Sequence, residues 1–281
     1  MARLDRSDRS DRVARATREI RESREGIVMG EQQTALDGKT AVVAGGAKNL
    51  GGLISRTLGE AGANVVVHYH SENTAADAEK TAEAVRGTGA QAVAVREDLT
   101  RVEGVRSLFD QALDAFGGVD VAVNTTGMVL RKPIAETTEE EYDRMFAINS
   151  KAAYFFLQEA GARLNDGGRI VSLVTSLLAA FTDGYSTYAG AKAPLEHFTR
   201  AAAKELAPRG ISVNNVAPGP MDTPFFYPQE TPERVEFHKS QAMGGRLTEI
   251  EDIAPLVKFL VTDGGWITGQ TIFANGGYTV R

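Results

Sequence analysis

Tyr188 and Lys192 stand four residues apart in a segment predicted to be helical. Side chains at positions i and i+4 lie one above the other on the same face of a helix. A free phenol titrates near about 10, and a cation close by lowers its pKa by roughly 1–3 units. We therefore predict that Tyr188 exchanges a proton with a substrate oxygen, and that Lys192 lowers its pKa.

A hydroxyl group, that of Ser176, follows the apolar run 170–174 and precedes Tyr188 by twelve residues. At the carboxyl end of a strand such a hydroxyl can hydrogen-bond the negative charge that develops on a substrate oxygen. Together these side chains indicate chemistry at a carbonyl or alcohol group.

A glycine-rich turn at 45–52 connects the apolar run Thr40–Ala44 to a predicted helix. Gly45 permits a sharp exit from a strand, and Gly51 permits close approach of the backbone to a pyrophosphate. The free N–H groups and the positive dipole end of the helix attract phosphate. Between these glycines stands Asn49, which tolerates a left-handed conformation better than most residues. The order strand, turn, helix predicts a dinucleotide site.

The end of the second apolar run, 64–69, favours NADP over NAD. An acidic side chain about 20 residues after the glycine turn binds the ribose 2′-hydroxyl of NAD. This sequence has His70 and Ser71 there instead. Lys48 in the turn, with His70 or Ser71, supplies charge and hydrogen bonds for a 2′-phosphate. The alternative is that Lys48 is a solvated turn residue and either cofactor is accepted.

Taken together, these motifs resemble the short-chain dehydrogenase/reductase family, most closely its 3-oxoacyl-[acyl-carrier-protein] reductase-like members, over about residues 37–281. The resemblance implies four catalytic residues: Asn149, Ser176, Tyr188 and Lys192. The family's serine commonly stands thirteen residues before the tyrosine, which would select Thr175. We favour Ser176 because it follows Asn149 by 27 residues, a spacing similar to the family's. Asn149 would hold a water linked to Lys192, and Lys192 would also bind the nicotinamide ribose.

The same resemblance implies contacts with the nucleotide beyond the turn. It places Asp98 near the adenine, Asn124 and Gly127 beside the adenine ribose, and Thr223 near the nicotinamide amide or the diphosphate. The segment 124–127 reads Asn-Thr-Thr-Gly where the family usually has Asn-Asn-Ala-Gly. The predicted cofactor contacts are Gly45, Ala47, Lys48, Asn49, Leu50, Gly51, His70, Ser71, Asp98, Leu99, Asn124, Gly127, Pro218, Gly219 and Thr223.

Short apolar runs alternate with helical segments, which predicts the α/β class: a Rossmann-type, doubly wound sheet of about seven parallel strands flanked by helices in a single domain. The predicted strands are 40–44, 64–69, 92–96, 119–124, 169–174, 211–216 and 271–274. The predicted helices are 51–60, 74–86, 102–116, 139–165, 188–206 and 250–261. They belong to an NAD(P)-binding catalytic domain at 37–281. Residues 1–36 form a low-complexity extension with an arginine at every third position from Arg3 to Arg24, and we predict that it is disordered.

The amino-acid composition limits which partners the protein can bind. The net charge of −6 offers no overall positive field for nucleic acid or an anionic membrane. The chain contains no cysteine, which excludes disulfides and thiolate sites and makes the cytoplasm the expected compartment. The four histidines lack metal-ligand spacing, and no apolar run reaches the roughly 20 residues of a membrane span. We expect a small-molecule carbonyl or alcohol substrate, no metal and, from the resemblance, a homotetramer.

The leading hypothesis is an NADP-dependent reductase of ketones or 3-oxoacyl thioesters. One alternative is a sugar, polyol or steroid alcohol dehydrogenase of the same family, because the chemistry is reversible. Another is a sensor that holds NADP without turnover. The segment 225–245 begins with Phe225, Phe226 and Tyr227 and predicts a mobile lid over an apolar or ring-bearing substrate.

Overall fold

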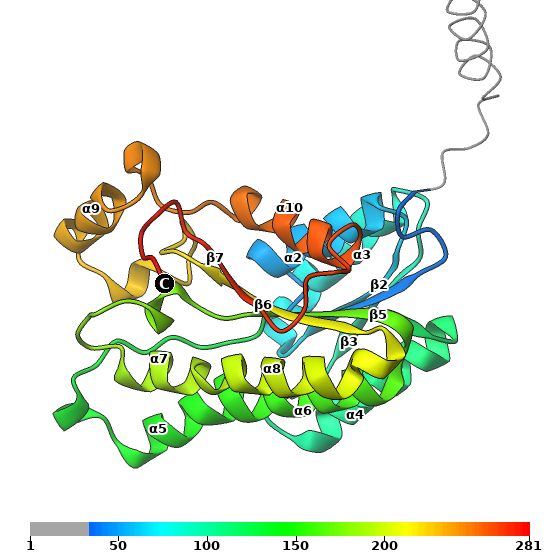
Figure 1. Ribbon diagram of the computed structural model, residues 1–281, viewed down its shortest axis with the longest axis horizontal. Helices are drawn as coiled ribbons and strands as arrows, with labels where there is room; N and C mark the ends of the chain where they lie inside the picture. The colour runs from blue at the N-terminus through cyan, green and yellow to red at the C-terminus, as the bar shows by residue number, and fades with distance from the viewer. Residues whose placement is uncertain (1–33) are drawn as a thin grey trace, which may run out of the picture. The chain divides into compact units, whose positions relative to one another are not determined.

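Seven strands pair side by side in the computed structural model, which describes residues 34–281 (Figure 1). They are β1 (Thr40–Ala44), β2 (Asn64–Tyr69), β3 (Ala92–Arg96), β4 (Val119–Asn124), β5 (Leu164–Leu173), β6 (Ser212–Pro218) and β7 (Thr271–Ala274). Their order in the sheet is β3-β2-β1-β4-β5-β6-β7, and all neighbours are parallel. The predicted Rossmann-type fold is confirmed.

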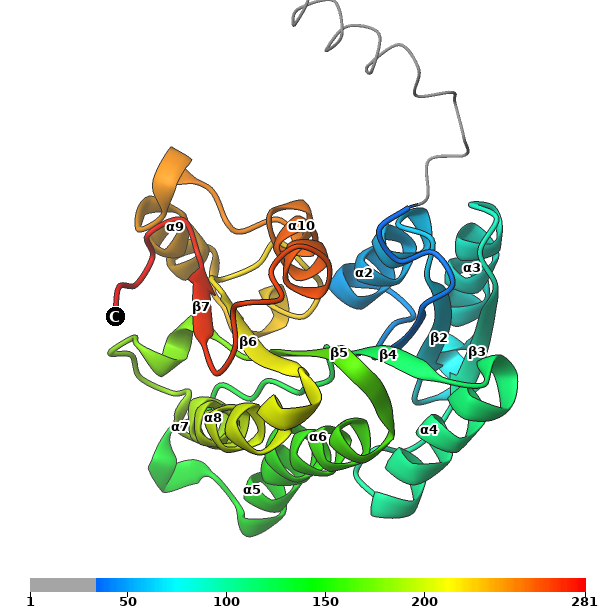
Figure 2. The same cartoon turned by 45° about the vertical axis from the view of Figure 1, so that its right-hand side comes forward.

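Helices cover both faces of this sheet (Figure 2). On one face lie α2 (Asn49–Glu60), α3 (Ala75–Arg86) and α10 (Ile250–Val261). On the other lie α4 (Val102–Phe116), α6 (Ala152–Arg163) and α8 (Pro194–Leu206). Side chains of β1 alternate between the two cores, with Val43 in the first and Val42 in the second, as the pleat of a strand requires. Burial on both faces explains why the strands read as continuous apolar runs.

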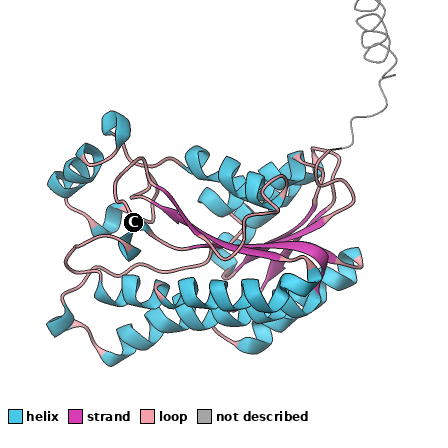
Figure 3. Cartoon of the chain, in the orientation of Figure 1, coloured by secondary structure: helices cyan, strands magenta, loops and turns pink. Residues whose placement is uncertain are grey.

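Two predicted helices, which run along the lower part of the molecule in Figure 3, each consist of more than one element. The predicted helix 139–165 consists of α5 (Glu139–Phe146), the π-helical turn η3 (Ala147–Lys151) and α6, and its last residues belong to β5. The predicted helix 188–206 consists of α7 (Ser186–Lys192) and α8, which starts at Pro194. Proline lacks the N–H that would continue the preceding helix but fits the first turn of a new one.

One helix, α9 (Pro232–Ser240), was not predicted. Thr231 caps its start by accepting a hydrogen bond from the Arg234 backbone, and Pro232 occupies its first turn. Single-turn helices complete the described chain: η1 (Glu72–Thr74), η2 (Ile134–Glu136), η4 (Ser176–Leu178), η5 (Ala207–Arg209), η6 (Tyr227–Gln229) and η7 (Met243–Gly245). In residues 34–281, none of the helices has the length and apolar character needed to cross a membrane.

The start of the domain differs slightly from the predicted boundary. Leu36 is buried in the core, and its N–H donates to the carbonyl of Ala61 at 2.8 Å. The folded unit therefore includes residue 36. Residues 1–33, which make up most of the predicted disordered extension, lie outside the described residues.

Candidate active site

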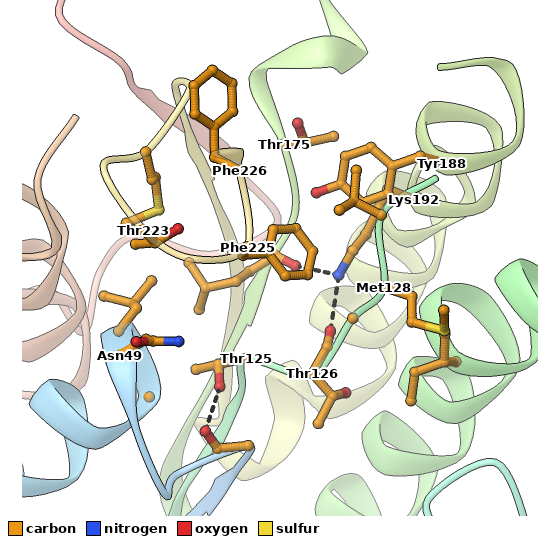
Figure 4. A pocket seen from close by; sticks show the side chains of 18 of the residues that line it. Asn49, Thr125, Thr126, Met128, Thr175, Tyr188, Lys192, Thr223, Phe225 and Phe226 are labelled. Atoms are coloured by element: carbon orange, nitrogen blue, oxygen red, sulfur yellow. Dashed lines mark hydrogen bonds between the residues drawn. The ribbon is translucent and has the colours of Figure 1, made fainter. Parts of the chain in front are cut away.

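A cavity of about 770 Å³ opens where the carboxyl ends of six strands meet, from β1 to β6 (Figure 4). In a doubly wound sheet this edge is where ligands bind. Every predicted catalytic or cofactor residue lines the cavity except Asn124 and Asn149, which lie directly behind its wall. The fold thus brings together residues that are spread over 45–223 in the sequence.

The glycine turn has the shape that a pyrophosphate needs. Gly45 has φ +75°, and Asn49, with φ 48°, is the single non-glycine residue of positive φ within residues 34–281. A Cβ on Gly51 would lie 2.1 Å from the Gly45 carbonyl oxygen. Lys48 is the N-cap of α2, and because a lysine side chain has no acceptor, the N–H groups of the first turn have no side-chain cap. The turn fits a dinucleotide.

His68, to which the sequence assigned no role, anchors this turn from β2. Its Nδ1 accepts a hydrogen bond from the Gly45 N–H at 2.9 Å, and its Nε2 lies 3.1 Å from the carbonyl oxygen of Glu97. These two partners require a neutral ring with its proton on Nε2. Burial lowers the pKa of His68 to about 4, so the ring is neutral near neutral pH.

Basic and acidic side chains alternate on the rim beside β2. The Lys48 ammonium lies 3.6 Å from the Asp77 carboxylate, and His70 Nδ1 lies 3.9 Å from Asp98. Ser71 lines the same rim. A 2′-phosphate here would compete with Asp77 for Lys48, and the sequence alone gave no sign of this partner.

The turn after β4 is closed by side-chain hydrogen bonds, although its sequence departs from the family's Asn-Asn-Ala-Gly pattern. Asn124 Oδ1 accepts hydrogen bonds from the Thr126 N–H at 3.0 Å and from its hydroxyl at 2.6 Å. The Thr125 hydroxyl donates to the carbonyl of Ala44 at 2.8 Å and so joins β4 to β1, and it also lies 3.3 Å from the carbonyl oxygen of Gly45 (Figure 4). These hydrogen bonds of the two threonines keep the turn closed.

Lys192 points its ammonium group into the floor of the cavity. Its Nζ donates to the carbonyl of Thr126 at 3.0 Å and to that of Leu173 at 2.9 Å (Figure 4). Burial lowers the pKa of Lys192 to about 8.

Asn149 lies in the π-helical turn, a local widening of the helix that is frequent at functional sites. Its side chain clamps the backbone of Met128, with Nδ2 donating to the carbonyl at 2.9 Å and Oδ1 accepting from the N–H at 3.1 Å. A Cβ on Gly127 would lie 2.9 Å from Asn149 Oδ1 and 3.2 Å from Lys192 Nζ. Glycine at 127 therefore lets Asn149 and Lys192 approach the same point.

The Tyr188 phenol is buried in the cavity wall. Burial raises its pKa to about 12, and a hydrogen bond with Thr175 only partly opposes this rise. An effect of Lys192 is not among these two causes, and the expectation that Lys192 lowers the pKa of Tyr188 stays a prediction.

Thr175, and not Ser176, is the hydroxyl that acts on the pKa of Tyr188, which it lowers. The Ser176 hydroxyl donates to the carbonyl of Ala217 at 3.2 Å and accepts from Asn275 Nδ2 at 3.0 Å. Ser176 thus ties the end of β5 to β6 and to the carboxyl-terminal segment. The spacing of thirteen residues before Tyr188 was the signal for Thr175 in the sequence.

The predicted lid lies over the catalytic end of the cavity. The ring of Phe225 is 6.4 Å from that of Tyr188, and the segment continues through η6, α9 and η7. Before it, Pro218, Gly219 and Thr223 line the cavity at the end of β6. Within residues 34–281, no cluster of histidine and carboxylate side chains is arranged to hold a metal ion.

The sheet order, the phosphate-type turn and the buried tyrosine and lysine define a dinucleotide-dependent α/β oxidoreductase. Residues 45–279 match the family model described as enoyl-(acyl carrier protein) reductase. An NADPH-dependent aldehyde reductase-like chloroplastic protein of Arabidopsis thaliana is 39% identical over 258 residues, which are 86% of this chain and 95% of that protein. A hydroxynaphthalene reductase-like protein of Metarhizium brunneum is 37% identical over 262 residues, 88% of this chain and 97% of that protein.

Among solved structures, a Burkholderia cenocepacia protein described as a dehydrogenase with bound NADP superposes with a TM-score of 0.86. It is 55% identical and covers 90% of this chain and 97% of its own. The chain belongs to the short-chain dehydrogenase/reductase family. It is therefore an oxidoreductase that acts on alcohol or carbonyl groups.

Proposed function

We propose that this protein is an NADPH-dependent carbonyl reductase in which Tyr188 gives a proton to the carbonyl oxygen of a ketone or aldehyde. The observation that carries the proposal is the buried phenol of Tyr188, which lies in the cavity wall between Thr175 and the lid residue Phe225. With its pKa raised to about 12, Tyr188 stays protonated near neutral pH and can donate. The Arabidopsis and Metarhizium relatives are named as reductases.

The assignment of NADPH as the cofactor rests on the glycine turn and on the side chains at the edge of the cavity beside β2. The backbone of 45–51 would hold the pyrophosphate, and Lys48, His70 and Ser71 would bind a 2′-phosphate. NADP is bound in the Burkholderia structure, and the Arabidopsis relative is named NADPH-dependent. When bound, the reduced nicotinamide supplies a hydride to the carbonyl carbon.

The chain's own residues would complete the reduction. As the carbon gains hydride, its oxygen gains negative charge and takes the proton of Tyr188. We propose that Thr175, rather than Ser176, donates a hydrogen bond to that oxygen. Lys192, supported by the loop that Asn149 fixes, would bind the nicotinamide ribose and stabilise the phenolate until a solvent proton restores it.

The proposed direction rests on the relatives that are named reductases. The chemistry itself is reversible, so we place the alcohol dehydrogenase alternative second and the NADP-binding sensor third.

The test compares the wild type with Tyr188→Phe in NADPH-consumption assays on ketones, diketones, 3-oxoacyl thioesters and, given the description of the family model, an enoyl thioester. Loss of the acid should lower kcat by about 10²–10⁴-fold while NADPH still binds. Thr175→Ala should lower kcat more than the matched variant Ser176→Ala, whose hydroxyl bonds are structural. Tight NADPH binding without turnover of any carbonyl would instead support the sensor.

Assembly and location are also proposals. We propose a homotetramer in the cytoplasm, acting on a small molecule. The fully exposed rings of Phe181 and Trp266 are compatible with burial against another copy of the chain. Gel filtration with light scattering measures the assembly, and a monomer peak would contradict it.

A further inference from the structure

A buried carboxylate, that of Glu230, lies where the lid meets the rest of the catalytic end. The lid is the segment 225–245, and Glu230 stands in it between η6 and α9. Its side chain is 0% exposed. A buried carboxylate is destabilising unless hydrogen bonds satisfy its oxygens. Its partners therefore show which parts of the chain Glu230 holds together.

The partners of Glu230 come from two parts of the chain. Arg234 Nε donates to Oε2 at 2.9 Å, and His238 Nε2 lies 3.3 Å from Oε1. Both residues belong to α9, so these contacts are made within the lid. The Tyr185 hydroxyl also donates to Oε1, and Tyr185 lies outside the lid. Burial and this bond raise the pKa of Tyr185, so its hydroxyl keeps the proton and remains the donor.

Tyr185 connects the lid to the helix that carries the proposed acid. It is the N-cap residue of α7, and its carbonyl accepts a hydrogen bond from the Ala189 N–H at 2.8 Å. Tyr188 follows three residues later, and the two ring centroids are 6.3 Å apart. A displacement of Tyr185 would therefore displace the first turn of α7 and with it Tyr188. The bond from Tyr185 to Glu230 thus ties the lid to the helix of the proton donor.

Exposed ion pairs join the same parts of the chain. Asp183 Oδ1 lies 3.1 Å from Arg234 Nη2, and Asp183 Oδ2 lies 3.4 Å from Arg131 Nη2. The Asp183 side chain is 74% exposed, and ion pairs in contact with water contribute little because solvent and salt screen them. A hydrogen bond to a buried carboxylate is screened much less. The bond between Tyr185 and Glu230 should therefore hold the lid more strongly than the surface pairs do.

The lid in this position places an aromatic ring beside Tyr188. The ring centroid of Phe225 is 6.4 Å from that of Tyr188. Behind it, Phe226 is 9% exposed and packs against His238 with 5.5 Å between the centroids. A lid that is held here excludes water from a bound substrate, and it has to open before a product leaves.

We propose that Tyr185 and Glu230 are positioning residues that form a latch: their hydrogen bond holds the lid closed over the bound substrate and breaks before the product leaves. Neither side chain takes part in the proton transfer. This inference rests on the proposed reductase function and adds the pair of residues that controls closure. Loss of the bond favours the open lid, so the substrate binds less tightly while the chemistry in the closed complex is unchanged.

The first measurement compares the full-length wild type with Tyr185→Phe, which removes the hydroxyl and keeps the ring. Tyr227→Phe is the matched control, because Tyr227 belongs to the lid, is 44% exposed and donates its hydroxyl to Asp222, only five residues away. The backbone amides of α9 report the opening of the lid in hydrogen–deuterium exchange, because a helix of nine residues is not stable without tertiary contacts. They should exchange about tenfold or more faster in Tyr185→Phe, which loses a bond to a charged group, and at the wild-type rate in Tyr227→Phe.

Steady-state kinetics tests the role of the latch in the reaction. Tyr185→Phe should raise KM for a carbonyl substrate by about threefold or more without lowering kcat, because part of the binding free energy is then used to close the lid. A residue that only supports the fold would instead lower the amount of active enzyme, and hence kcat, at unchanged KM. Titration with NADPH counts the folded sites in each variant. Glu230→Gln keeps an oxygen that can accept from Tyr185 but removes the charge, so it should lie between the wild type and Tyr185→Phe in both measurements.

Exchange of α9 at the wild-type rate in Tyr185→Phe would overturn the latch. Faster exchange with an unchanged KM, or a fall in kcat at unchanged KM, would overturn its role in substrate binding. Should Tyr185→Phe fail to fold, Glu230→Gln provides the same comparison. The exchange measurement needs no substrate, so absence of turnover with every carbonyl would refute the proposed function, while the exchange rates would still decide whether the latch exists.

Discussion

Replacing His68 by asparagine tests how the phosphate turn is held in place. The neutral His68 ring accepts from the Gly45 N–H and donates to the Glu97 carbonyl, both from a buried position. Asparagine can still accept from Gly45 but does not titrate. At about pH 7 the variant should lose about 1–3 kcal/mol of unfolding free energy, because the Glu97 carbonyl loses its donor.

The pH dependence of the unfolding free energy tests the role of His68 independently. The pKa of His68 falls from 6.5 to about 4 on folding, so the folded protein binds fewer protons than the unfolded chain in this interval. The contribution of His68 to stability is therefore complete above about pH 6.5 and is lost as the pH falls toward about 4. Between about pH 7 and pH 5 the loss amounts to about 2 kcal/mol.

Urea unfolding of both proteins at these two pH values, at one protein concentration, measures the difference. Carboxylates also titrate in this range, but they contribute alike to both proteins. The wild type should therefore lose about 2 kcal/mol more than His68→Asn on acidification. Parallel losses in the two proteins would refute the assignment of a buried neutral imidazole at this position.

Two further predictions concern the cofactor site. Gly51→Ala should weaken NADPH binding by about tenfold or more, because its Cβ would lie 2.1 Å from the Gly45 carbonyl oxygen, whereas Gly190→Ala, which meets nothing within 4 Å, should bind normally. Fluorescence titration with NADPH measures both, and equal affinities would contradict the close-approach argument. Lys48→Ala should lower kcat/KM for NADPH by about tenfold and leave that for NADH unchanged, since a 2′-phosphate would lose a charge-assisted bond. A parallel loss with both cofactors would indicate that Lys48 shapes the turn instead. The variant Asp77→Asn removes the carboxylate that pairs with Lys48, so it should raise kcat/KM for NADPH relative to NADH.

The amino-acid sequence by itself determined the sheet and the phosphate turn. Burial on both faces makes each strand a short apolar run, and left-handed or crowded backbone positions select Gly45, Asn49 and Gly51. Tyr188 and Lys192 could be paired because they are four residues apart on one helix. All of these signals are local, so they can be read from neighbours in the chain.

Only the tertiary structure decided which groups meet across long separations. The proposed preference for Thr175 over Ser176 rests in part on Asn275, which lies 99 residues beyond Ser176 and donates a hydrogen bond to its hydroxyl. The raised pKa of Tyr188 comes from burial in the packed chain. Glu230 and His238 come from a segment whose polar pattern predicted no helix. Desolvation and hydrogen bonding between distant segments are properties of the packed chain, and no local spacing encodes them.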